Sequence, residues 1–92
     1  MALTDQQKKQ MRGRSHALKP VVHIGQSGLT QNVLHEVEQA LGHHELIKLK
    51  ARVGDRDARD AMIAELVAAT GAELIQQIGN VAVIFRPAPD EG

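Results

Sequence analysis

The chain of 92 residues contains no cysteine, tryptophan or tyrosine, and Phe85 is its only aromatic residue. Without cysteine, it has no disulfide framework, thiolate nucleophile or cysteine-ligated metal site. Because 42% of the residues are hydrophobic and only one of these is aromatic, the sequence predicts an aliphatic core. No apolar run approaches the roughly 20 residues that span a bilayer, and no secretion signal is recognisable. We therefore expect a cytoplasmic, monomeric domain over residues 1–87, followed by a flexible tail over 88–92.

Net charge is also lacking, because 11 basic and 11 acidic residues balance. Their distribution is uneven. Residues 1–28 hold five cations and one acid, residues 46–52 hold three cations and no acid, and residues 53–92 hold seven acids and three cations. A balanced total can therefore conceal a molecule with one basic and one acidic side, which would orient it toward a polyanion.

The apolar spacing predicts an α/β fold with an N-terminal helix followed by the order β-α-β-α-β-β. A capping box at residues 4–7 starts a helix that runs to about Ser15, with few apolar positions. Two further helices are capped by Thr30 and Asp55 and end at Gly42 and Gly71. Strands are expected over 21–24, 45–53, 72–78 and 81–86. Strands joined through helices favour parallel pairing and the last two form a hairpin, so we expect a four-stranded mixed sheet with helices packed on it.

A glycine loop lies between the first strand and the second helix. Gly25 and Gly28 allow close backbone approach, the Ser27 hydroxyl can donate a hydrogen bond, and the first N–H groups of the helix offer positive charge to a phosphate. Most turns of this kind merely connect a strand to a helix, so the loop alone is a weak signal. It also lacks the lysine and the glycine spacing of a nucleotide P-loop.

The second strand alternates strictly between two kinds of residue. Ile47, Leu49, Ala51 and Val53 form a core face, while Leu46, Lys48, Lys50 and Arg52 form a wet, cationic face. An isolated strand could carry such charges only to discourage edge pairing. Taken with Lys19, placed beside the glycine loop, and with Arg12 and Arg14 of the first helix, the ladder favours neutralisation of a phosphate backbone.

The sequence offers little for metal binding or catalysis. His43 and His44 are adjacent and diverge in most conformations, and His35 with Glu38 supplies at most two ligands on one helical face. No serine lies in a nucleophile elbow, and the acids of the third helix look like a solvated face. We therefore expect a binding protein without a metal or cofactor rather than an enzyme.

Several separated motifs together resemble the YhbY-type CRM domain (chloroplast RNA splicing and ribosome maturation). They are Lys19-Pro-Val-Val, Ile24-Gly-Gln-Ser-Gly-Leu-Thr30, His44-Glu-Leu-Ile-Lys-Leu-Lys50, and Gln77-Ile-Gly79 followed by Phe85-Arg-Pro87. The resemblance implies a fold similar to the C-terminal domain of bacterial translation initiation factor 3, and RNA binding through a GxxG loop like that of KH domains. Because the chain holds one copy and no extension, it implies binding to large-subunit ribosomal RNA during ribosome assembly rather than intron splicing.

Two positions depart from the family pattern. Asn80 stands where a lysine is common, and Phe85 where a tyrosine is common, which weakens the case for RNA contact through the last hairpin. The candidate RNA-binding residues are Arg12, Arg14, Lys19, Gly25, Gln26, Ser27, Gly28, Lys48, Lys50, Arg52 and Arg86. The alternative is a protein-interaction module of an assembly such as the ribosome, using the acidic third helix or the apolar sheet edge.

Overall fold

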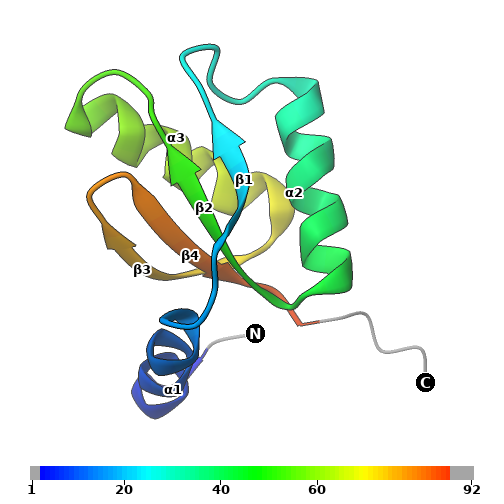
Figure 1. Cartoon of the computed structure of the whole chain (residues 1–92), viewed down its shortest axis with the longest axis vertical. Coiled ribbons are helices and arrows are strands. Elements are labelled where there is room, and N and C mark those ends of the chain that lie inside the picture. The colour runs from blue at the N-terminus through cyan, green and yellow to red at the C-terminus, as the bar shows by residue number, and fades with distance from the viewer. Residues whose placement is uncertain (1–2, 88–92) are drawn as a thin grey trace.

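Helices and strands follow one another in the predicted order (Figure 1). The computed structural model describes residues 3–87, so the tail expected over 88–92 lies outside the described residues. The elements are α1 (Asp5–Ser15), β1 (Pro20–Ile24), α2 (Gln31–His43), β2 (Leu46–Ala51), α3 (Arg56–Thr70), β3 (Glu73–Ile78) and β4 (Val81–Phe85). The α/β fold class is confirmed.

The four strands form one mixed sheet in the order β1-β2-β4-β3. β1 pairs with β2 in parallel, and β4 pairs antiparallel with both β2 and β3. Three connections meet at the carboxyl end of β2, because the Arg52 N–H donates to the Ile24 carbonyl at 2.8 Å and the Ala51 N–H to the Asn80 carbonyl at 2.7 Å. We call this the loop end of the sheet, where the β1–α2 loop, the β2–α3 loop and the β3–β4 hairpin lie together.

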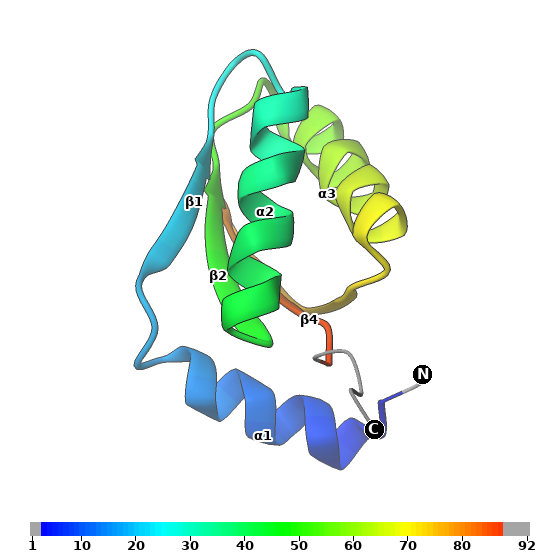
Figure 2. The ribbon, with the colours of Figure 1, turned by 90° about the vertical axis from the view of Figure 1, so that its right-hand side faces the viewer.

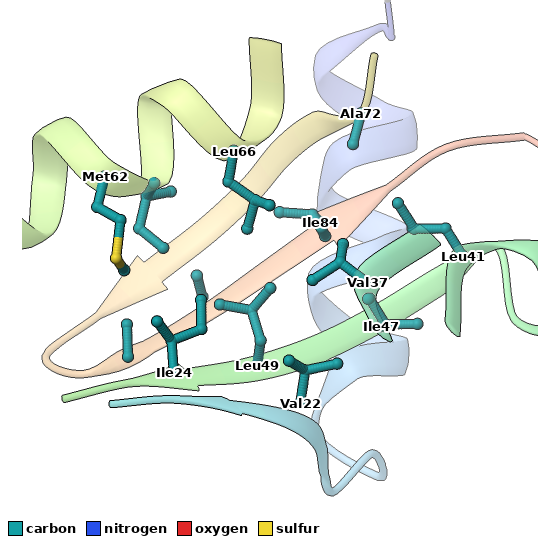
Figure 3. Close-up of a cluster of buried hydrophobic side chains, with 13 residues drawn as sticks. Val22, Ile24, Val37, Leu41, Ile47, Leu49, Met62, Leu66, Ala72 and Ile84 are labelled. Carbon is teal, nitrogen blue, oxygen red and sulfur yellow. The ribbon is translucent and has the colours of Figure 1, made fainter. Parts of the chain in front are cut away.

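Helices α2 and α3 cover one face of the sheet, which we call the covered face (Figure 2). Val37 and Leu41 of α2 and Leu66 of α3 pack onto inward side chains of the strands (Figure 3). The buried strand residues in this cluster are Val22, Ile24, Ile47, Leu49, Ala51, Ala82 and Ile84. The predicted aliphatic core is therefore confirmed. Phe85, the only aromatic residue of the chain, lies outside this cluster.

Side-chain caps set the helix starts as the sequence predicts. The Thr4 hydroxyl accepts from the Gln7 N–H at 3.1 Å while the Gln7 side chain accepts from the Thr4 N–H at 2.9 Å, which completes the capping box. At the C-termini the two glycines differ. Gly71 ends α3 in the left-handed conformation with φ +71°, whereas α2 continues through Gly42 to His43, so the predicted end at Gly42 is wrong by one residue.

The second sheet face, which we call the open face, is partly covered by α1. A small cluster of Leu46, Ile75, Val83 and Phe85 is buried there, and Leu3, Met11 and Leu18 pack against it. In Figures 1 and 2 the helix lies across the bottom of the sheet, away from the loop end. The prediction that Leu46 belongs to a wet face is therefore wrong: its side chain is only 5% exposed, because α1 covers it.

Candidate nucleic-acid interface

Beyond α1 the open face consists of alternate residues from all four strands. Residues directly opposite one another across a sheet point to the same side, so each row can be read from the pairing. His23, Lys50, Val81 and Ile78 form the row nearest the loop end, and Lys48, Val83 and Gln76 form the next. The open face is thus cationic along β2 and apolar toward β3 and β4.

A basic ladder runs along β2 toward the loop end and consists of Lys48, Lys50 and Arg52. Within the strand, the two-residue step places Lys48 and Lys50 about 6 to 7 Å apart on one face, and Arg52 follows directly after the strand ends at Ala51. Both lysines are half-buried and Arg52 is exposed, and none of the three is within ion-pair distance of a carboxylate of residues 3–87. These charges are therefore not neutralised by the described residues.

Acidic side chains gather on the opposite side of the molecule. Helices α2 and α3 form the layer behind the sheet, and their exposed positions include Glu36, Glu38, Asp57, Asp60 and Glu65. The uneven charge distribution of the chain thus becomes a separation in space. A polyanion approaching the open face meets the ladder first, with the acids of α2 and α3 held behind the sheet.

The glycine loop is a tight turn at the loop end, beside Arg52. The Gly28 N–H donates to the Gly25 carbonyl at 3.0 Å, and the Thr30 hydroxyl accepts from the Val33 N–H at 3.1 Å. The N–H groups of Gln26 and Ser27 have no acceptor among the described residues, and both residues are exposed. The first turn of α2 carries no acid, so its positive end is uncompensated there.

The two loop glycines differ in what the fold demands of them. Gly28 has a φ of +70°, a backbone conformation that residues other than glycine adopt only with strain. Gly25 has no positive φ, and a Cβ added to it would meet no atom within 4 Å. The fold itself therefore does not require glycine at position 25, and the surface there stays open to close approach from outside.

Lys19 does not lie beside the glycine loop, so that expectation is wrong. It precedes β1, whereas the loop follows β1, and an extended strand separates the two by about 20 Å. Lys19 instead lies near Lys48, because Pro20 pairs with Lys48 and both lysines line one hollow of about 230 Å³. It extends the basic ladder at the end remote from the loop.

Arg86 is held on the other side of the sheet. Its guanidinium donates to the Glu38 carboxylate and to the Thr70 carbonyl, both at 2.9 Å. These contacts join the end of β4 to α2 and to the C-terminus of α3. The structure therefore separates Arg86 from the basic ladder and gives it a structural role.

Arg12 and Arg14 occupy the last turn of α1, where cations stabilise the negative end of a helix. They lie at the end of the sheet opposite the glycine loop. His16 caps the C-terminus of this helix and is exposed. Contacts of these residues with RNA would therefore extend a path that begins at the loop and follows β2.

A second hollow on the open face was missed by the sequence interpretation. It measures about 230 Å³ and is lined by Ser15, His16, Lys48, Gln76, Ile78, Val81 and Val83. The alternation of Gln76 and Ile78 in β3 was a usable signal for a shared face, but the sequence does not show that α1 would end beside them.

Within residues 3–87, no group of three or more histidines and carboxylates could hold a metal ion, and no helix could span a membrane.

Comparison with known proteins gives one matching domain family and several relatives that are themselves named as RNA-binding proteins. Residues 3–86 match the model of the CRS1/YhbY (CRM) domain. A probable RNA-binding protein of Pseudomonas aeruginosa is 47% identical over 97% of this chain and 86% of its own length, and an RNA-binding protein of Haemophilus influenzae is 43% identical over 96% and 89%. The solution structure of a hypothetical protein from Staphylococcus aureus, itself proposed to bind RNA, superposes with a TM-score of 0.84 at 31% identity, covering 99% of this chain and 95% of that one.

Proposed function

The chain belongs to the CRS1/YhbY (CRM) domain family, and from this premise we propose that it binds RNA backbone across the glycine loop and the open sheet face. The observation that carries the proposal is the basic ladder, whose three cations have no carboxylate partner within residues 3–87 and lead to the loop. A cation row of this kind binds phosphates by charge and displaces their counterions.

The loop and the ladder complement each other chemically. Lysines neutralise phosphates as mobile point charges, whereas the guanidinium of an arginine and backbone N–H groups donate along defined directions. The unpaired N–H groups of Gln26 and Ser27, beside the first turn of α2, supply such donors next to Arg52. We assign to the loop the placement of one phosphate and to the ladder the binding of those that follow.

The RNA class is part of the proposal. The family resemblance implies large-subunit ribosomal RNA during ribosome assembly, and binding without catalysis agrees with the names of the relatives. Crosslinking the protein to RNA in cells and sequencing the attached RNA tests this directly. Enrichment of large-subunit ribosomal RNA supports the assignment, and enrichment of unrelated RNA contradicts it.

The ladder is tested by Lys48→Gln/Lys50→Gln. We expect weaker binding to single-stranded RNA and a salt dependence whose slope falls in magnitude by about 1.4, because each lost phosphate contact removes about 0.7. Filter binding between low and moderate salt measures both quantities. Arg56→Gln is the control: it removes an exposed cation from α3, where the 3.9 Å ion pair with Asp60 is too exposed to contribute much. An unchanged slope in the double variant would remove the open face from the account.

A further inference from the structure

One apolar side chain on the open face is largely exposed. Ile78 is 65% exposed, at the end of edge strand β3. It lines the hollow described above together with Val81 and Val83, while Lys48 borders the same hollow. We call this the β3 hollow. An apolar surface beside an unneutralised lysine suits a ligand that combines an uncharged planar group with an anionic one.

Three polar groups at the β3 hollow are not engaged elsewhere, whereas the Ser15 hydroxyl donates to the Arg12 carbonyl at 2.7 Å. Within the described residues, the Gln76 amide, the His16 ring and the Lys48 ammonium form no hydrogen bond or ion pair. The neighbouring Gln77 provides the contrast, because its amide donates to Asp60 at 2.7 Å on the covered side. The hollow thus has the composition of a ligand site, with apolar walls and a few polar groups that can fix an orientation.

We propose that the β3 hollow receives an unstacked nucleobase of single-stranded RNA, an inference that rests on the proposed RNA binding. The ring lies against Ile78 and Val81, the Gln76 amide meets a base edge, and Lys48 holds the adjoining phosphate on the ladder. With about 230 Å³ the hollow is smaller than the roughly 300 to 1,000 Å³ of sites for drug-sized ligands, which suits a single heterocycle. Apolar and histidine side chains can both hold a base removed from its stack.

The test compares Ile78→Ser with Leu74→Ser. Both residues are exposed leucine or isoleucine side chains of β3, but Leu74, 38% exposed, pairs with the core residue Ile84 and so lies on the covered side. Each variant is titrated with a labelled single-stranded RNA and with an abasic ribose-phosphate oligomer of equal length. We expect Ile78→Ser to weaken RNA binding at least about fivefold, because the apolar surface that the base covers is lost, and to leave abasic binding unchanged. Leu74→Ser should change neither.

Gln76→Ala gives a second measurement that does not depend on stacking. Because an amide reads the edge of a base, we expect this variant to reduce the differences in affinity among homopolymeric RNAs. Equal behaviour of the Ile78 and Leu74 variants, or an equal loss for RNA and the abasic oligomer, would overturn the base site. Self-association that Ile78→Ser abolishes, seen by sedimentation, would also overturn it by assigning the patch to a second copy of the chain. Failure of the unaltered protein to bind either oligomer would instead reject the proposed function.

Discussion

At the scale of single residues, the two loop glycines have different roles: the fold requires Gly28, whereas Gly25 leaves space for a bound molecule. Gly28 needs a left-handed backbone, whereas Gly25 is in ordinary conformation with open space beside it. Residue spacing alone treats the two as equivalent members of one motif. Only the backbone angle distinguishes them, and that angle depends on how the turn joins β1 to α2.

This distinction predicts different results for the two alanine variants. Gly28→Ala should lower the free energy of unfolding by about 1 to 2 kcal/mol, because alanine is strained at positive φ. Gly25→Ala should change it by less than about 0.5 kcal/mol, as for other unconstrained surface positions, yet weaken RNA binding by obstructing close approach. Chemical denaturation and filter binding give the two readouts. A Gly25→Ala protein with full RNA affinity would show that nothing approaches the loop closely.

Arg86 and Arg52 make a second informative pair. Arg86→Gln should lower the free energy of unfolding by about 1 to 2 kcal/mol, because a charged donor to Glu38 and to the Thr70 carbonyl is lost. Its RNA affinity should remain within about twofold of the unaltered protein. Arg52→Gln should do the reverse, with stability nearly unchanged and RNA binding weakened. If Arg86→Gln weakens RNA binding while stability holds, the structural role assigned to this arginine is wrong.

At the scale of elements, the sequence predicted the helices and strands well because their signals are local. The capping box of α1, the Asp55 cap and Gly71 of α3, and the alternation in β2 each depend on neighbours within a few residues. The docking of α1 was harder to predict, because Leu3, Met11 and Leu18 form no strong helical stripe. Their role becomes clear only from their packing against Phe85 and its neighbours. Burial of Leu46 follows from the same long-range contact.

The position of Lys19 could have been predicted more accurately. Six residues of extended chain necessarily carry it about 20 Å from Gly25, so a lysine before β1 cannot accompany a loop after β1. The pairing of β1 with β2, in contrast, was needed to place Lys19 near Lys48. Strand length was readable from the sequence, whereas strand register was not.

The docking of α1 is tested by Met11→Asp. A carboxylate at this half-buried position would have to leave water to keep the helix packed, so we expect α1 to undock. The free energy of unfolding should fall by about 1 to 3 kcal/mol. Hydrogen exchange should show faster exchange of the α1 amides while those of β2 and β4 remain protected. Gln10→Asp, at an exposed position of the same helix, is the control, and retained protection of α1 in Met11→Asp would contradict the docking.

At the scale of the whole molecule, a chain of zero net charge is polarised by its fold. The sheet carries the basic ladder on its open face, and α2 and α3 carry exposed acids behind it. Composition cannot show such a separation, because it depends on which side of the sheet each helix packs. The polarity also explains how a protein with a pI near 7.0 could orient toward RNA.

The most direct test of this account is an NMR titration of the protein with single-stranded RNA, followed through its backbone amides. We predict that the largest shift changes occur at residues 25–30, 48–52 and 76–81, which together trace the glycine loop, the basic ladder and the β3 hollow. Exposed residues of α3 such as Glu65 and Ala69 should remain unchanged. Shift changes concentrated on the outer surfaces of α2 and α3, with the loop and β2 unaffected, would contradict the placement of RNA on the open face.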